Sequence, residues 1–182
     1  MSGIPDESQV DLTELHNRII AAIRERFGAR LTTVDMYNPV DPNSQSIKTP
    51  AVLLELAEIR PAGRATGGRT PMELVWTAHC VLSAQTENVQ LEVRNFAAHL
   101  LRLIDGARWG LEYVERAADL EAFPGLFTPG EKGFESWLVS WKQTAHLGEA
   151  WELPVDGPAV EVFLGESPQI GQAHEGNYQR VV

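Results

Sequence analysis

The amino-acid sequence predicts an α+β fold, with a twisted, mostly antiparallel sheet, two amphipathic helices packed on one face, a long projecting β-hairpin and an extended C-terminal tail. Two segments repeat apolar residues at helical spacing, and several others alternate apolar and polar residues as half-buried strands do. The chain of 182 residues is 43% hydrophobic, which suits one domain. The residues after Gly165 are too polar to form a core. We therefore expect a single domain over residues 1–165 and an extended tail over residues 166–182.

Each predicted helix carries one apolar stripe. The first helix covers residues 12–27 and is followed by Gly28, a common residue just past a helix end. The second opens at Thr86 and Glu87 and ends at Gly106. The stripes consist of Leu12, Leu15, Ile19, Ala22, Ile23 and Phe27 in the first helix, and of Val89, Val93, Phe96, Ala97, Leu100 and Ile104 in the second. The other faces are polar, so each helix should lie on a surface with only its stripe buried.

Strands are predicted where β-branched residues cluster or where apolar residues alternate with polar ones. The predicted strands are residues 30–37, 51–59, 73–83 and 136–144, and a short last strand with Val160, Val162 and Leu164. We expect 51–59 and 73–83 to pair as a hairpin. Residues 111–123 suit a strand followed by a connection, but the part from 115 to 121 suits a helix equally well, so both possibilities stay open.

An Arg/Gly loop is predicted at the end of this hairpin, from Arg60 to Pro71. It contains Arg60, Arg64 and Arg69, no large apolar residue and no carboxylate, so we expect it to be mobile. Residues 67–70 superficially resemble a phosphate-binding turn, but they lack its lysine and precede a strand. Two interpretations remain, namely a solvated hairpin tip or arginines that reach acidic groups on another subunit.

The charge and the chain ends limit the possible partners. The formal net charge of -10 argues against a nucleic-acid-binding surface, which needs clustered lysine and arginine, although it suits a passage through which DNA moves without sticking. Residues 1–9 lack the pattern of a secretory signal, and no apolar run approaches the ~20 residues that cross a bilayer. We expect a soluble cytoplasmic product with no membrane partner.

Residues for catalysis or metal binding are sparse. His79 adjoins Cys80, the single cysteine, but adjacent side chains on a strand point to opposite faces and cannot readily form a Cys–His pair. We expect a buried cysteine and a half-exposed histidine. The other histidines lack the converging ligands of a metal site: His16, His99, His146 with Glu149, and His174 with Glu175. The sequence therefore predicts no catalytic residue, no cofactor and no metal.

A few residues are candidates for contact with partners. Trp109 and Trp151 lie near turns, and tryptophan is enriched in interfaces, whereas the other tryptophans fall on alternating core positions. Ile170 and Tyr178 are isolated apolar residues in the polar tail, which either dangles or docks on a neighbour. The candidate interface residues are Arg60, Arg64, Arg69, Trp109, Trp151, Ile170 and Tyr178.

The order of these elements resembles that of the tail terminator proteins of bacteriophages, particularly the Mu-like tail proteins. The resemblance covers most of the chain and consists of diffuse patterns. The residues that carry it are 15–23, 49–56, 87–104, 137–151, 163–171, and Asn177 with Tyr178. No catalytic residue is implied.

The resemblance implies a function through assembly. Tail terminators form a ring, usually of about six subunits, that caps the head-proximal end of the tail tube, stops its polymerisation and joins it to the neck. The implied partners are further copies of the chain, the tail tube protein, a neck or head-completion protein and the sheath of a contractile tail, while DNA only passes through the lumen. The implied location is the virion, after assembly in the host cytoplasm.

Three alternatives remain open. A head-completion protein or a tail tube protein, of a phage or a tailocin, would use the same kind of fold. An enzyme whose catalytic groups converge from distant positions is the alternative from another class.

A projecting hairpin and a docking tail would supply the two different surfaces that a ring subunit needs. Whether the Arg/Gly loop faces the lumen or the tube is not decided by the sequence.

Overall fold

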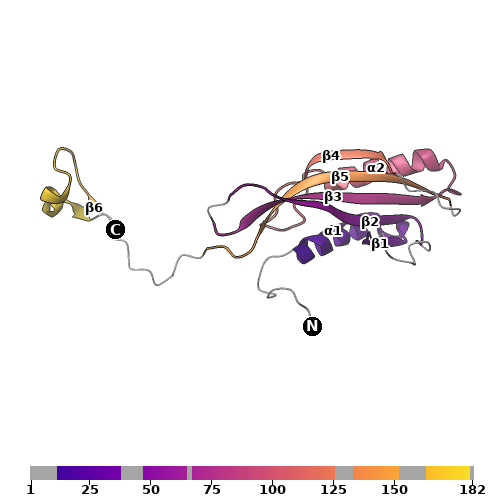
Figure 1. Cartoon of the computed structure of the whole chain (residues 1–182), viewed down its shortest axis with the longest axis horizontal. Helices are drawn as coiled ribbons and strands as arrows, with labels where there is room; N and C mark the ends of the chain where they lie inside the picture. The colour runs from indigo at the N-terminus through magenta and orange to yellow at the C-terminus, as the bar shows by residue number, and fades with distance from the viewer. Residues whose placement is uncertain (1–11, 38–46, 65–66, 126–132, 152–162, 181–182) are drawn as a thin grey trace, which may run out of the picture. The chain divides into compact units, whose positions relative to one another are not determined.

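The structure is a computed structural model that describes residues 12–37, 47–64, 67–125, 133–151 and 163–180 (Figure 1). The chain forms two compact units, residues 1–150 and residues 151–182. We call them the sheet unit and the C-terminal unit and describe each by itself.

The sheet unit contains a five-stranded mixed sheet with the strand order β1-β2-β3-β5-β4. Its strands are β1 (Thr33–Met36), β2 (Ala51–Pro61), β3 (Thr70–Ser83), β4 (Ala118–Pro124) and β5 (Phe134–Leu147). Only β1 and β2 pair in parallel, and all the other neighbours are antiparallel. Two helices, α1 (Leu12–Phe27) and α2 (Val89–Ile104), accompany the sheet, with the short turn η1 (Gly28–Arg30) after α1. The predicted α+β fold is confirmed.

Both helices bury their apolar stripes against one face of the sheet. The core joins Leu15, Ile19, Ile20 and Ile23 of α1 and Ala97, Leu100 and Ile104 of α2 to Leu74, Trp76, Ala78 and Cys80 of β3 and Val139, Trp141 and Ala145 of β5. Across the two central strands, the rings of Trp76 and Trp141 stack with centroids 6.3 Å apart. Phe27 and Phe96 meet edge to face, 5.4 Å apart, and link the two helices. Such aromatic pairs add to the stabilisation that burial alone provides.

The helix ends follow the expected chemistry with one difference. Gly28 and Gly106 adopt positive φ angles of 55° and 66°, which glycine tolerates without a steric penalty. The second helix begins at Val89 rather than at Thr86, because Asn88 adopts a left-handed conformation that cannot continue a right-handed helix. The sequence pattern located the stripe correctly but not this first turn.

The hairpin of β2 and β3 is longer than expected, and the Arg/Gly loop is correspondingly shorter. β2 continues through Pro61 and β3 begins at Thr70, so only residues 62–69 connect the strands. The extension arises because β5 runs alongside β3 to its start, where Thr70 lies opposite Leu147 and adds backbone pairing. The end of the hairpin extends beyond α1 (Figure 1).

Of the two alternatives for residues 111–123, strand or helix, the structure shows a strand in the second half of the segment. β4 starts at Ala118 and pairs with β5, while the preceding residues 107–117 form turns and irregular backbone. This segment forms a strand despite its local preference for a helix, because β4 provides hydrogen-bond partners for backbone N–H and C=O groups of β5 that would otherwise have none.

The C-terminal unit forms a small hairpin instead of a fully extended tail. β6 (Phe163–Leu164) pairs with β7 (Gln179–Arg180), and the turn η3 (Gln172–Asn177) lies between them. The expected end of the domain, residue 165, lies inside this unit. Leu164 pairs within this hairpin and not with the main sheet, whereas Val160 and Val162 lie outside the described residues.

Candidate functional site

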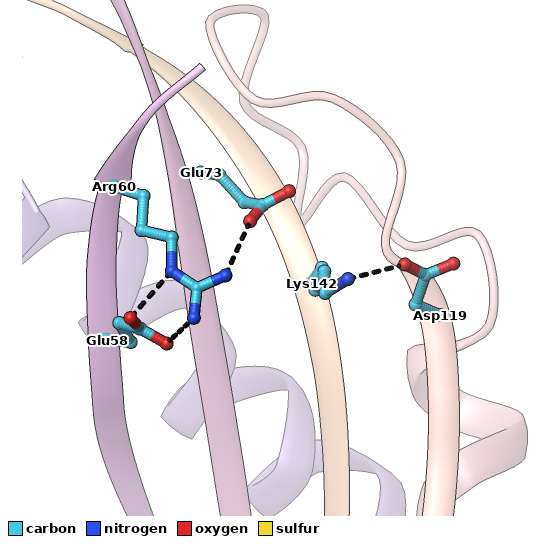
Figure 2. Close-up of polar contacts among 5 residues, drawn as sticks. All are labelled: Glu58, Arg60, Glu73, Asp119 and Lys142. Atoms are coloured by element: carbon cyan, nitrogen blue, oxygen red, sulfur yellow. Dashed lines mark hydrogen bonds and ion pairs between the residues drawn. The ribbon is translucent and has the colours of Figure 1, made fainter.

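The face of the sheet opposite the helices carries a row of charged side chains across four strands. Figure 2 shows Glu58 and Arg60 of β2, Glu73 of β3, Lys142 of β5 and Asp119 of β4. Glu73 and Lys142 each adjoin a residue of the helix-facing core, so alternation directs them to the other face. Neither described helix covers this face.

The two cations of this row are bound by carboxylates of the same subunit. Arg60 donates from Nε to Glu58 Oε1 at 2.6 Å and lies 3.9 Å from Glu73 Oε1. Lys142 Nζ donates to Asp119 Oδ2 at 2.9 Å (Figure 2). The hydrogen bond to Glu58 raises the pKa of Arg60, and the bond to Asp119 raises the pKa of Lys142. Of the predicted interface arginines, Arg60 therefore already has its partners within the subunit.

Arg64 and Arg69 differ from Arg60 in their surroundings. Arg64 is exposed, and no described residue forms a hydrogen bond or ion pair with it. Arg69 directly precedes β3 and is half-buried, and its Nε is buried without an acceptor among the described residues. A buried N–H without an acceptor is unfavourable, so Arg69 is a side chain that would gain from an additional oxygen nearby.

Trp109 is held by its own subunit. Its side chain packs partly buried against the core, and its Nε1 donates to Gln143 Oε1 at 2.8 Å. Gln143 also accepts from Trp141 Nε1 and donates from Nε2 to the carbonyl oxygens of Ala107 and Glu115. The buried amide thus uses all its hydrogen-bonding capacity to hold the segment before β4.

Gln143 was not among the sequence candidates, although a signal for it existed. It continues the inward series of Trp137, Val139 and Trp141 along β5, where a polar residue needs partners from elsewhere in the fold. The alternation indicates that this amide is buried, but only the tertiary structure identifies what it bonds.

The C-terminal unit exposes most of its large apolar side chains. Trp151 is 78% exposed, and Ile170 is 57% exposed, as expected for interface candidates. Phe163 and Leu164, which the sequence prediction did not select, are exposed as well. Among the described residues of this unit, none is buried.

Tyr178 stabilises the C-terminal unit internally. Its hydroxyl accepts a hydrogen bond from the backbone N–H of Gly171 at 2.6 Å. Its ring lies so close to Gly165 that an added Cβ would be 2.5 Å from Tyr178 Cε1. The amide of Asn177 also donates to Gln169 at 3.0 Å. Tyr178 is therefore a closing contact of the hairpin, with a partly exposed ring.

His79 and Cys80 lie on opposite faces as the sequence predicted, but the side chain of His79 is only 14% exposed rather than half-exposed. Cys80 is buried on the helix-facing side, where desolvation raises the pKa of its thiol and keeps it protonated. His79 lies on the other face, where its ring stacks on Tyr37 at 4.4 Å and its Nε2 lies 2.9 Å from Glu55 Oε2. The two side chains do not form a Cys–His couple.

The remaining histidines bring no metal-ligand cluster together within the described part of the chain. His146 Nε2 lies 2.9 Å from Glu115 Oε1, not near a set of three ligands. Within residues 12–37, 47–64, 67–125, 133–151 and 163–180, no group of three or more candidate ligands occurs. None of the helices described is long and apolar enough to cross a membrane.

Two features stand out among the described residues. One is the end of the β2–β3 hairpin with Arg64 and Arg69, and the other is the apolar surface of the C-terminal unit. Comparison of the sequence with protein-family models gives no match, and comparison with curated proteins gives none either.

Proposed function

We propose that this chain is a structural subunit that assembles with copies of itself into a ring, as a tail terminator of a phage or a related tail. In this role the ring caps the head-proximal end of the tail tube, stops its growth and joins it to the neck. The observation that carries the proposal is the C-terminal unit, whose large apolar side chains have no core of their own.

Exposed apolar residues in a small separate unit favour docking on a partner. Trp151, Phe163, Leu164 and Ile170 are each about half exposed or more. Removing such surface from water contributes about 25 cal/mol per Å², so burying several side chains together gives a substantial driving force. Large apolar side chains exposed on otherwise polar segments are candidates for interaction sites. The C-terminal unit therefore suits a contact between subunits.

Two different surfaces on one subunit are what a closed ring requires. A head-to-tail contact joins unlike surfaces and closes into a ring when the rotation between the subunits permits. The projecting hairpin and the C-terminal unit are two such surfaces on separate units of the chain. The net charge of -10 also suits a lumen through which DNA passes without adhering.

The first test measures assembly of the purified full-length chain. Sedimentation velocity and negative-stain microscopy should reveal a ring of about six subunits. Added to polymerising tail tube protein, the ring should shorten the tubes and appear at one end of each. A chain that stays monomeric, both alone and beside growing tubes, would contradict the proposal. Open-ended tubes formed by the chain alone would contradict the terminator role and favour the tail tube alternative.

A matched pair of variants tests the observation itself. Ile170→Ser should weaken ring formation, because Ile170 belongs to the proposed docking surface. Leu91→Ser is the control, since Leu91 on α2 has the same exposed fraction of 57% but lies in the sheet unit. Both variants should unfold at the same denaturant concentration as the wild type, because neither side chain is buried. Equal loss of assembly in both would show that the C-terminal unit is not the docking surface.

A further inference from the structure

We propose that the C-terminal unit of one copy binds the end of the β2–β3 hairpin of another copy, with Arg64 and Arg69 pairing with its carboxylates. This inference rests on the proposed assembly and specifies which two surfaces meet. We define the hairpin end as Ile59, Arg64 and Arg69.

The hairpin end is exposed in a way that the rest of the hairpin is not. The first four residues of β2, 51–54, are buried, whereas its last five, 57–61, are all exposed. Ile59 in this stretch is 50% exposed, which places apolar surface next to the loop. On the paired strand, Thr70 is exposed but Pro71 is buried. The exposed β2 side of this end is therefore able to receive a partner without any rearrangement of the core.

Arg64 and Arg69 supply the charge of this surface. From Arg60 to Pro71 the sequence contains no carboxylate, and Arg60 is held by Glu58 and Glu73. Arg64 is exposed, and the buried Nε of Arg69 has no acceptor among the described residues. The planar guanidinium group is well suited to bind a carboxylate through two hydrogen bonds.

The C-terminal unit has the complementary chemistry. Residues 151–182 contain five acidic residues against one arginine, which is a formal charge of -4. Two of the five, Glu166 and Glu175, are described and exposed. Phe163 and Ile170 in the same unit offer apolar surface to match Ile59. The proposed occupant of the hairpin end is therefore a second copy of this chain.

The proposed contact allows a closed assembly when the rotation between neighbouring copies permits. Each copy has one C-terminal unit, which binds the next copy, and one hairpin end, which binds the C-terminal unit of the previous copy. The contacts therefore continue from copy to copy around the ring. When the last copy meets the first, every arginine pair and every acidic unit has a partner.

Charge reversal in two separate variants tests the contact. Arg64→Glu/Arg69→Glu reverses the receiving surface, and Glu166→Lys/Glu175→Lys reverses the binding unit. Each variant alone places like charges opposite each other, which should weaken self-association about a hundredfold or more. An equimolar mixture should restore assembly, because alternating copies then pair opposite charges at every contact. Sedimentation velocity and negative-stain microscopy report on all three samples.

A control of equal charge separates this contact from a general electrostatic effect. Arg26→Glu/Arg30→Glu changes the net charge by the same amount as the loop variant, at exposed positions on α1 and η1. It should assemble as the wild type does. Assembly of the loop variant at wild-type strength would overturn the inference and leave the proposed ring intact.

The mixture also distinguishes contact between copies from contact within one copy. If a chain carrying all four reversals assembles but the mixture does not, the two surfaces meet within one chain, and the inference is wrong. If the wild type forms no ring, the proposed function fails, and the contact is then judged by cross-linking Arg64→Cys in one copy to Glu166→Cys in another. Cys80, the single native cysteine, is buried and should not compete. A cross-linked pair of copies supports the contact, and its absence overturns it.

Discussion

The sheet unit and the C-terminal unit differ in what holds them together. In the sheet unit, two helices and three central strands bury a continuous core around Trp76 and Trp141. In the C-terminal unit, no described residue is buried, and the hairpin is closed by Tyr178 against Gly165 and by a few hydrogen bonds. The first unit is therefore stabilised by its own core, whereas the second leaves most of its large apolar side chains exposed to solvent.

Size explains much of this difference. A unit of 32 residues, such as 151–182, cannot enclose enough apolar surface to offset the conformational entropy lost on folding. Units below about 40 residues usually need a disulfide, a metal or a partner for stability. Because Cys80, the single cysteine, lies in the sheet unit, a disulfide within the C-terminal unit is excluded.

The largest expected effect concerns the buried amide of the sheet unit. Gln143→Leu keeps a similar volume but removes the acceptor of Trp109 Nε1 and Trp141 Nε1 and the side-chain donor to the carbonyl oxygens of Ala107 and Glu115. We expect a loss of about 3 kcal/mol in the free energy of unfolding, measured by urea denaturation with tryptophan fluorescence. Hydrogen exchange in residues 163–180 should not change, because this network lies wholly in the sheet unit.

The matched control for this variant is Gln90→Leu, an exposed position on α2. It should alter the free energy of unfolding by less than about 0.5 kcal/mol. A loss below that limit for Gln143→Leu would show that the segment before β4 is not held by this amide. Faster exchange in the C-terminal unit would show that the two units are coupled.

A smaller effect, confined to the C-terminal unit, is expected from Gly165→Ala. The added Cβ would lie 2.5 Å from Tyr178 Cε1, so the ring must move away, and its bond to the Gly171 amide should open. We expect exchange of the Gly171 amide to accelerate about tenfold, while the urea midpoint of the sheet unit stays unchanged. Amide exchange measured by NMR checks this directly.

Gly176→Ala is the control for that substitution. No heavy atom lies within 4 Å of the Cβ that it would add, so the hairpin should remain closed. If Gly165→Ala lowers the stability of the sheet unit, the two units do not behave independently. If both variants exchange at the wild-type rate, Tyr178 does not close the hairpin.

The smallest effect is a pH dependence in the sheet unit. Burial lowers the pKa of His16 below its ordinary value of 6.5, and the charge of Asp35 opposes this only in part. The unfolded chain then binds the proton more tightly, so stability is complete above pH 6.5 and declines as the pH falls through the lower pKa of the folded state. The ring of His16 lies beside that of Trp76, a core residue, with 6.1 Å between the ring centroids.

His16→Gln should remove this part of the pH dependence. Urea midpoints of the wild type and the variant, measured at about pH 8 and about pH 5, give the difference, and carboxylates common to both chains cancel. The wild type should lose more stability than the variant on acidification. An equal loss of stability in both would mean that His16 remains solvated. A greater loss in the variant would mean that folding raises the pKa of His16 instead of lowering it.

Local periodicity was sufficient to predict the elements that build the core. The stripes of α1 and α2 and the alternation along β3 and β5 depend only on neighbouring residues, and the structure confirms each of them. The exposure of Trp151 and Ile170 could also be expected, because the polar sequence around them contains too little to cover them.

Long-range pairing decided what periodicity could not. The strand β4 and the extra length of the hairpin both arise from pairing with β5, whose residues are distant in sequence. The same holds for Arg60 and Trp109, which the sequence grouped with the interface candidates. The structure shows that Glu73 and Gln143, respectively, contact them within the subunit.

The sequence by itself determined an acidic α+β chain with two amphipathic helices, a hairpin rich in arginine and glycine, and a polar C-terminal segment. These properties follow from composition and from periods of two and of about 3.6 residues, which require no knowledge of contacts. Only the tertiary structure decided which arginines are already paired and that the C-terminal segment closes on Tyr178. The reason is that hydrogen bonds and ion pairs depend on distances in space, which spacing along the chain does not encode.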